Sequence, residues 1–345
     1  MTRRPTPTID HLAQRLGVHK STVSRALDPA RRHLISVELL RRVERAAREL
    51  GFRPNHAAAA LSTGRSKTIG VLLPDITNPV FPPILRGIED ALDADGYVAL
   101  VANTSRHENA AQAAVERMHS MRVEGFLVAT AVRDDAGLEA LRRSGARIVL
   151  VNRSDGRGEL PAVTSDDMLG MRLAVDHLVA LGHRRLVHLA GPAALSTGLA
   201  RRIGFEQALQ AHGLAPAGVV ECEAYAVDAG QVAMRSLLAR RRRFGAVVAA
   251  NDLIALGALQ ALRERGIGVP DAVSVIGHND MPLLDQVSPP LTSVRIQHYE
   301  MGLCAARLLL ASLRGAAGGR ETTIVLPPAL VVRSSTAAPA RRGPG

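Results

Sequence analysis

Three polar residues near the N-terminus have the types and spacing to read DNA bases. Lys20, Ser21 and Arg25 fall on one side of a short stretch whose other side carries Val23 and Ala26. If this stretch is helical, Arg25 lies one turn beyond Ser21 on the same face. A guanidinium in the major groove can pair with guanine through two hydrogen bonds. The pattern favours contact with base edges, although a solvated helix surface would carry similar charges.

The rest of the chain lacks motifs for catalysis. It contains no G-x-G-x-x-G after a strand, no G-x-x-x-x-G-K-[ST], no G-x-S-x-G and no H-E-x-x-H. A predicted helix and the strand after it contain His177, His183 and His188, but these residues lack the spacing of metal ligands. Cys222 and Cys304 are too few for a disulfide framework. We therefore expect no enzyme activity, no cofactor and no metal site.

Positive charge is concentrated at the N-terminal end. The 345 residues carry a net charge of +11. The segment 1–66 contains 13 Lys or Arg and 5 Asp or Glu, a net of +8, which leaves +3 for the other 279 residues. This asymmetry indicates a head that binds nucleic acid on a nearly neutral body.

The basic segment has the pattern of three short helices and a linker. An apolar stripe at 9–16 is capped by Thr8 and ended by Gly17, a second helix covers about 20–27, and a third runs from about 36 to Gly51. The first two, joined by a tight turn, form a helix-turn-helix. The alanine-rich segment 54–62 is too short to be a stable helix alone, but it could become helical when held.

Beyond Lys67, strand-like runs alternate with amphipathic helical stretches. The first series is TIGVLLP, YVALVAN, GFLVAT, RIVLVN and AVTSD; the second is RLVHLAG, GVVECEAY, AVVAAND, SVIGHND and TSVRI. Such alternation predicts parallel sheets flanked by helices. Each series has the size of one doubly wound lobe, so we expect two α/β lobes with a ligand cleft at the carboxyl ends of their strands.

These segments resemble the lactose and galactose repressor family, usually called the LacI family. The resemblance covers GVHKSTVSRALDPARRHLISVELLRRVERAARELGFRPNHAAAALSTGRSKTIGVLLPDITNPVF at 17–81, and then LVALGHRRLVHLAGP (178–192), RRIGF (201–205), ANDLIALGALQAL (250–262) and PPLTSVRI (289–296), in order and at family spacing. It implies a dimeric regulator, most often a repressor, with a helix-turn-helix head, a hinge helix and a periplasmic-binding-protein-like body of type I.

The resemblance also implies domain boundaries. We expect a helix-turn-helix domain at 1–52, a hinge helix and linker at 53–66, and an effector-binding and dimerisation domain at 67–340. Within that domain the N-lobe is expected at about 67–163 plus 293–322, and the C-lobe at about 164–292 plus 323–337.

Carried over by position, the resemblance assigns DNA contacts to the head and the hinge. The expected residues are Thr8, Lys20, Ser21, Thr22, Ser24, Arg25, Asn55, His56, Ala58 and Leu61. Two hinges that pair through their alanines would push Leu61 between base steps of the minor groove; an inert linker is the alternative. His19 departs from the family, which commonly has Ser or Thr there as a helix cap. A symmetric dimer requires a pseudo-palindromic operator.

The effector site implied by the resemblance lies between the lobes. The expected residues are Asn78, Val80, Phe81, Arg153, Thr197, Arg201, Tyr225, Asn251, Asp252 and Asn279. Amides and a guanidinium suit the hydroxyls or carboxylate of a sugar or related metabolite.

Structural roles compete with ligand contact at several of these positions. Asn251 and Asp252 could cap a helix, Asn78 could stabilise a turn, and Phe81 and Tyr225 could belong to the core.

Two departures from the family bear on the ligand. Asn279 stands where an aspartate is frequent, and Ile296 replaces a common glutamine. A neutral or anionic ligand is thereby favoured over a cationic one. Whether ligand releases DNA or promotes its binding remains open at this stage.

Two other classes of protein share parts of this pattern. A solute-binding protein for transport would need an export signal, and the opening MTRRPTPTID has no apolar core for one. A non-specific DNA-organising protein would need only the basic head. No apolar run approaches the ~20 residues of a membrane span, so a cytoplasmic homodimer without membrane contact is expected.

Overall fold

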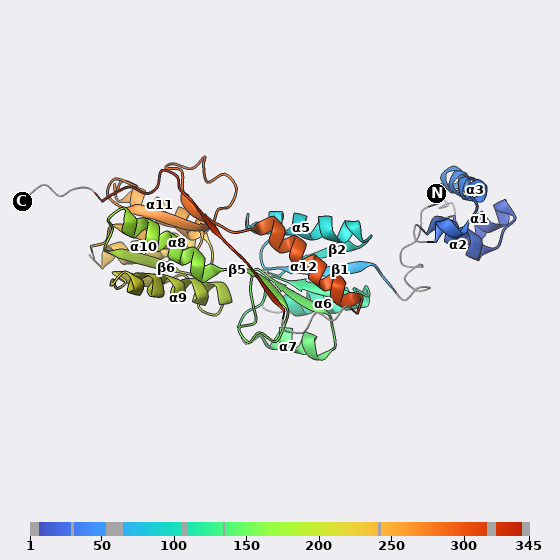
Figure 1. The fold of residues 1–345 in the computed structure, drawn as a ribbon, viewed down its shortest axis with the longest axis horizontal. Helices are drawn as coiled ribbons and strands as arrows, with labels where there is room; N and C mark the ends of the chain where they lie inside the picture. The colour runs from blue at the N-terminus through green and yellow to red at the C-terminus, as the bar shows by residue number, and fades with distance from the viewer. Residues whose placement is uncertain are drawn as a thin grey trace, which may run out of the picture. The chain divides into compact units, whose positions relative to one another are not determined.

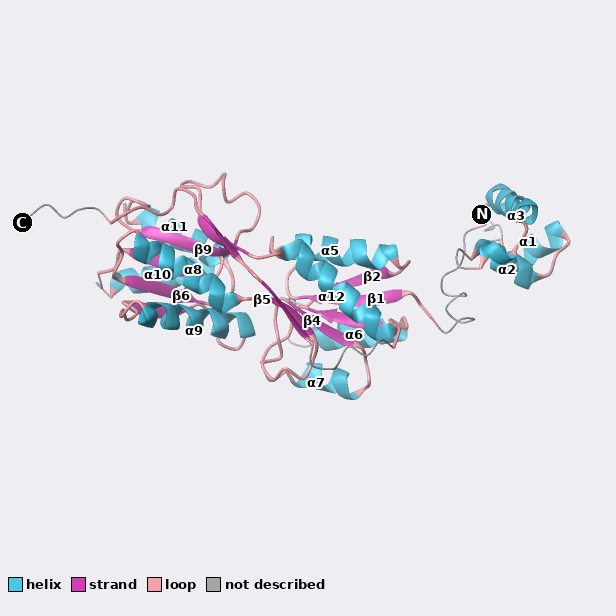
Figure 2. Ribbon diagram, in the orientation of Figure 1, coloured by secondary structure: helices cyan, strands magenta, loops and turns pink. Residues whose placement is uncertain are grey.

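The chain divides into two units, Met1–Ser66 and Lys67–Gly345, each described here by itself (Figures 1 and 2). The computed structural model describes residues 7–28, 31–52, 65–104, 110–133, 135–240, 243–315 and 322–339. The expected hinge contacts Asn55, His56, Ala58 and Leu61 lie outside the described residues.

Within its described residues, 7–28 and 31–52, the N-terminal unit contains the three expected α-helices. They are α1 (Ile9–Leu16), α2 (Lys20–Leu27) and α3 (Val37–Leu50), with a 3₁₀ turn η1 (Arg32–Leu34) before α3. Leu12, Val23 and Val43, one from each helix, are fully buried together. This shared core holds α2 against the other two helices.

Local signals in the sequence fix the ends of α1 and α3. The hydroxyl of Thr8 accepts a hydrogen bond from the backbone N–H of His11, and Ser36 does the same for Leu39. Gly17 and Gly51 end the helices at φ values of 65° and 64°, a left-handed conformation that glycine adopts without a steric penalty.

The second unit contains two six-stranded sheets. The first sheet has the order β11-β5-β4-β3-β1-β2 and is parallel throughout. The second has the order β12-β10-β9-β8-β6-β7 and is parallel except for β12. The strands of the first sheet are β1 (Thr68–Leu73), β2 (Val98–Asn103), β3 (Gly125–Val128), β4 (Ile148–Val151), β5 (Ala162–Ser165) and β11 (Thr323–Leu326). Those of the second are β6 (Leu186–Ala190), β7 (Gly218–Glu221), β8 (Ala246–Ala249), β9 (Ser274–Asn279), β10 (Thr292–Arg295) and β12 (Ala329–Val331).

Helices cover both faces of each sheet. The first lobe has α5 (Phe81–Ala94) and α12 (His298–Leu313) on one face, and α6 (Ala110–Ser120) and α7 (Ala136–Arg143) on the other (Figure 1). The second has α10 (Val227–Ala239) and α11 (Asp252–Glu264) on one face, and α8 (Asp167–Ala180) and α9 (Ser196–Ala211) on the other. None of the described helices is long and apolar enough to cross a membrane.

Residues of β1 alternate between the two cores of the first lobe. Ile69, Val71 and Leu73 pack in the core beneath α5 and α12, whereas Leu72 packs in the opposite core with α6. A strand buried on both faces reads as a continuous apolar run, as TIGVLL does. The expected two-lobed α/β body is confirmed.

Glycines let one helix pair in each lobe approach closely. A Cβ atom on Gly87 of α5 would lie 2.1 Å from the carbonyl oxygen of Tyr299 in α12. One on Gly257 of α11 would lie 1.9 Å from the carbonyl oxygen of Val227 in α10. Both separations are shorter than any real contact, so a larger residue would force the helices apart.

The expected lobe boundaries near the C-terminus are wrong for two strands. β10 was assigned largely to the N-lobe but pairs with β9 in the second sheet. β11 was assigned to the C-lobe but pairs with β5 in the first sheet. The chain therefore crosses between lobes after β5, after β10 and after β11, because each sheet takes its last strands from the C-terminal segment.

Candidate functional site

Helix α2 presents a polar surface on the outside of the N-terminal unit. Lys20, Ser24 and Arg25 are exposed, and Ser21 and Thr22 are half-buried, while Val23 and Ala26 fill the core. The predicted base-reading side chains thus lie on the side of α2 away from its core. Thr8 is exposed as well, with its hydroxyl committed to capping α1.

His19 starts α2 in the place of the expected Ser or Thr. Its Nδ1 accepts a hydrogen bond from the backbone N–H of Ser21 at 3.3 Å and lies 2.8 Å from the Ser21 hydroxyl. The imidazole thus serves as the cap that a hydroxyl commonly provides. Helix α2 therefore keeps a side-chain cap at its N-terminus although His19 departs from the family's Ser or Thr.

Nine of the ten expected effector residues line one cavity between the lobes. The space that they enclose in this conformation is small, about 20 Å³, room for about one water molecule, so a sugar-sized ligand requires the lobes or the lining side chains to move apart. Its lining residues are Asn78, Val80, Phe81, Asn152, Arg153, Thr197, Arg201, Tyr225, Asn251 and Asn279.

The topology explains why residues so far apart in sequence meet here. Asn78 follows β1, Arg153 follows β4, Tyr225 follows β7, Asn251 follows β8 and Asn279 ends β9. The carboxyl ends of parallel strands share one edge of a sheet, which is where open α/β folds bind ligands. In this chain the carboxyl-end edges of the two sheets face each other across the cavity.

Arg201 is the central charged residue of the cavity and is only 2% exposed. Its Nε donates to Asp167 at 2.8 Å, one terminal nitrogen donates to the carbonyl oxygen of Ala250 at 2.6 Å, and the other donates to Asn279 at 3.2 Å. Burial acts to lower the pKa of Arg201, but Asp167 and the other neighbours outweigh it, so the net direction is upward. Arg201 therefore stays charged and has a structural role that the sequence did not reveal.

Two hydrogen bonds connect the lobes beside the cavity. The backbone N–H of Arg133 donates to the carbonyl oxygen of Ala194 at 2.9 Å. The backbone N–H of Ser154 donates to the Ser196 hydroxyl at 2.9 Å. These contacts join the end of the first sheet to the start of α9, and opening of the cleft would break them.

Several lining residues have the structural roles considered above. Asn251 caps α11 by accepting from the N–H of Ile254 at 2.8 Å, and Asn78 accepts from the N–H of Val80 at 3.2 Å. The phenol of Tyr225 donates to Thr197 at 3.1 Å. Phe81 is buried in the first lobe's core.

Asp252 is the one expected effector residue outside the lining. Its carboxylate accepts from the Ser293 hydroxyl at 2.5 Å and from the backbone N–H of Met281 at 2.9 Å. It therefore ties the start of α11 to β10 and to the segment after β9. Burial raises the pKa of Asp252 from an ordinary 3.8 to about 7, although both hydrogen bonds oppose the shift.

This pKa predicts a pH dependence of stability. The folded protein retains a proton on Asp252 that the unfolded chain releases above pH 4, so stability falls as pH rises from 4 to 7. From pH 5 to pH 8 the carboxyl contributes a loss of roughly 2–3 kcal/mol. Asp252→Asn keeps a similar shape without ionising, so urea unfolding at both pH values should show a correspondingly smaller loss. An equal loss in the variant and the wild type would contradict this assignment.

The sequence analysis missed two residues at the site. Asn152 lines the cavity at φ 66°, a left-handed conformation that asparagine tolerates better than most residues. Its position directly after an apolar strand could have revealed it. Asp167 pairs with Arg201, and the need of a buried guanidinium for a carboxylate was the available signal.

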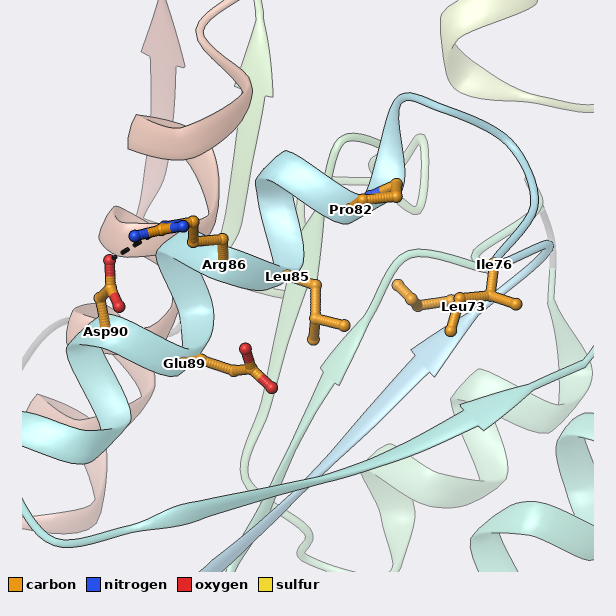
Figure 3. A pocket seen from close by; sticks show the side chains of 7 residues that line it. All are labelled: Leu73, Ile76, Pro82, Leu85, Arg86, Glu89 and Asp90. Carbon is orange, nitrogen blue, oxygen red and sulfur yellow. Dashed lines mark ion pairs between the residues drawn. The ribbon is translucent and has the colours of Figure 1, made fainter.

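A second hollow lies between α5 and the end of β1 (Figure 3). The floor of this hollow is apolar and is formed by Leu73, Ile76, Pro82 and Leu85. Charged side chains of α5 lie beside the floor, and two of them, Arg86 and Asp90, form an ion pair at 3.9 Å. It lacks the converging amides and hydroxyls of the cavity between the lobes.

The three histidines considered as metal ligands in the sequence have hydrogen-bond partners within the protein. His177 lies 3.0 Å from the Thr336 hydroxyl, His183 lies 2.9 Å from the carbonyl oxygen of Ala337, and His188 lies 2.7 Å from that of Val248. Across the described part of the chain, no group of three or more His, Cys, Asp or Glu side chains could hold a metal ion. Burial raises the pKa of the Cys222 thiol to about 12, which makes it unreactive at neutral pH.

Comparison with family models matches both units. Residues 8–55 match the model of bacterial regulatory proteins of the lacI family. Residues 175–336 match that of a periplasmic binding protein-like domain.

Curated relatives cover almost the whole chain. The transcriptional regulator CelR of Thermobifida fusca is 33% identical, over 97% of this chain and 100% of that protein. MalR of Streptomyces coelicolor is 33% identical over 98% and 99%, and the repressor CytR of Escherichia coli is 31% identical over 96% of each chain. All are transcriptional regulators rather than enzymes.

Solved structures match the same architecture. The lac repressor dimer bound to operator and the anti-inducer ONPF has a TM-score of 0.86 at 27% identity, over 96% of this chain and 100% of that one. The complex of CelR with cellobiose has a TM-score of 0.74 at 30% identity, over 95% and 99%.

Proposed function

Because the chain belongs to the LacI family of bacterial transcriptional regulators, we propose that it represses transcription by binding a pseudo-palindromic operator as a homodimer, under the control of a small polar effector. The chain is a DNA-binding transcriptional regulator with a helix-turn-helix head. The exposed polar face of α2 supports the proposal, because Lys20 and Arg25 are accessible on it and the second helix of a helix-turn-helix is the one that enters the major groove.

The cavity between the lobes supports control by a sugar or a related metabolite. Its amides, hydroxyls and guanidinium groups match a ligand rich in oxygen, and CelR is known in complex with cellobiose. A ligand that binds the closed body better than the open one shifts the equilibrium between them by that difference in affinity. The hydrogen bonds from Arg133 and Ser154 across the cleft are the contacts that such a shift would make or break.

The hollow on α5 supports a dimer contact through this helix. An apolar floor with charged residues along its edge is the usual anatomy of a protein interface. Leu85 and Pro82 would then contact a second copy of the chain, while Arg86 and Asp90 lie beside them (Figure 3). Dimerisation would bring two heads to two half-sites.

We also infer that the protein has no enzymatic activity and acts in the cytoplasm. The curated relatives are transcriptional regulators, and the lining of the cavity consists of amides, hydroxyls, guanidinium groups and apolar side chains. A regulator of transcription must reach chromosomal DNA, which supports the location.

Selection from random duplexes tests the central proposal. The purified full chain, incubated at fixed salt with a pool of random duplexes, should enrich a pseudo-palindromic motif. Binding without any enriched motif would reduce the function to a basic surface and refute the proposal.

The same assay tests the hinge. We propose that Leu61 enters the minor groove, so Leu61→Ala should weaken binding to the enriched duplex by roughly tenfold through loss of the inserted side chain. Ala59→Ser, which leaves Leu61 in place, is the control. Unchanged affinity of Leu61→Ala would favour the inert linker.

A further inference from the structure

The two arginines of the cavity differ in their partners. Arg201 is neutralised by Asp167, and two further hydrogen bonds occupy its guanidinium. The pair as a whole contributes no net charge to the cavity.

Arg153 has no such partner. Its Nε is shielded from solvent and has no hydrogen-bond partner among the described residues. Burial lowers the pKa of Arg153, and the neighbouring Arg201 lowers it further, while the phenol of Tyr225 raises it. No carboxylate contributes to this shift in the pKa of Arg153.

Two acids close to Arg153 in the sequence or beside Arg201 have other partners. Asp155, two residues along the chain, accepts hydrogen bonds at both carboxylate oxygens from four backbone N–H groups of residues 157–160. Asp167 pairs with Arg201. Neither acid can turn to Arg153 without breaking these bonds.

The backbone around Arg153 is held in place. The next residue, Ser154, bonds to Ser196 across the cleft, and β4 before it is fully buried. The backbone of Arg153 is therefore fixed at the edge of the cavity, and its half-buried guanidinium lacks the carboxylate partner that charges removed from water usually have.

The remaining lining suits a polyhydroxylated body. Four asparagines surround the cavity, Thr197 and Tyr225 add hydroxyls, and Phe81 can cover an apolar ring face. The N-terminal ends of α5, α9 and α11 also contribute lining residues, and their dipoles favour electronegative groups.

We propose that the effector carries an anionic group, a carboxylate or a phosphate, which pairs with Arg153. This deepens the proposed function and rests on it, because it names the class of ligand for the same cavity: a sugar acid or a sugar phosphate rather than a neutral sugar. The anion supplies the partner that Arg153 lacks, and the amides bind the hydroxyls.

The test compares ligands that share a carbon skeleton. Thermal unfolding and calorimetry of the full chain are run with glucose, galactose and mannose, with their aldonates, uronates and 6-phosphates, and with inorganic phosphate alone. Anions should raise the melting temperature and neutral sugars should not. The aldonate and uronate arms identify a carboxylate, and the 6-phosphate arm identifies a phosphate.

Two variants separate the effect of the charge at Arg153 from that of an exposed charge elsewhere on the lobe. Arg153→Gln should weaken the binding of the anion by roughly 10- to 100-fold, as expected for loss of a charge-assisted pair. Its stability without ligand should be unchanged or higher, because the change removes a half-buried guanidinium whose Nε is shielded from solvent without a hydrogen-bond partner. Arg147→Gln removes the same charge from the exposed residue just before β4 and should change neither.

Each remaining outcome overturns the proposal. Neutral sugars that bind as tightly as their acids, anion binding that survives Arg153→Gln, or failure of every anion to stabilise the protein would do so. A neutral sugar that displaces operator DNA would overturn this inference and leave the proposed function intact, whereas binding without an operator motif would refute the proposed function itself.

Discussion

Arg25→Ala is expected to remove sequence preference from DNA binding. Each bidentate contact to a guanine provides roughly 1–3 kcal/mol of discrimination, and a dimer would lose two of them. The enriched motif should therefore lose its preferred base at the contacted position in each half-site. Residual binding should depend on phosphate contacts and fall steeply with salt. Binding constants for the enriched and a scrambled duplex, measured over a salt series, give the answer.

Arg45→Ala is the matched control for this experiment. Arg45 is exposed on α3 of the same unit, so its loss removes the same charge without touching α2. It should lower affinity for both duplexes alike and keep their ratio. If Arg25→Ala also kept that ratio, Arg25 would be a solvated surface charge and the assignment of α2 would fail.

Arg201→Ala is expected to destabilise the second unit and to abolish its response to ligand. The change leaves Asp167 as a buried carboxylate without its partner, and it also strands the oxygens of Ala250 and Asn279. Breaking a buried ion pair from one side typically costs about 3–5 kcal/mol. Urea unfolding of the full chain should show this loss in the transition assigned to the body.

Two further variants isolate the cause. Arg202→Ala removes the adjacent, half-exposed arginine and its surface pair with Glu206, and should cost at most about 1 kcal/mol. Asp167→Ala combined with Arg201→Ala should cost less than the sum of the single changes, because neither charge is then left alone. Additive losses would mean that the pair is not coupled.

The sequence predicted the N-terminal unit closely because its signals are local. Thr8, Ser36 and the glycines at 17 and 51 set helix ends within a residue of those observed, and the periodicity of apolar residues identified the core face. The role of His19 was less evident, since an imidazole cap depends on a side-chain orientation that spacing alone does not reveal.

The body was predicted in outline but not in its last strands. Ten apolar runs became the ten strands β1 to β10. Most of these strands are buried on both faces, which gives them a distinctive composition, whereas β2 and β7 are half-buried edge strands. In β11 exposed residues alternate with half-buried ones, and β12 has only three residues, none of them fully buried. Their places depend on pairing with strands far away in sequence, which no local pattern encodes.

At the cavity, resemblance and strand-end position found residues but not their partners. The resemblance located Arg201, and both signals located Asn279, which ends β9. The bond between these residues and the pairing of Arg201 with Asp167 arise only when α8, α9 and β9 pack together. Asp252 illustrates the converse. It directly follows a lining residue, but the turn into α11 directs its carboxylate to Ser293 and Met281 instead.

The return of the chain to the first sheet sets an order of events during synthesis on the ribosome. The helical head has its whole sequence available once Phe52 has emerged. The edge partner of β5, by contrast, is made last: Thr323 pairs beside Ala162, 161 residues later. At 5–20 residues per second this delay is roughly 8–32 s. In a nascent chain the helical head can therefore fold well before the first sheet is complete. Truncation anywhere before β11 leaves β5 at the edge of the first sheet without its partner.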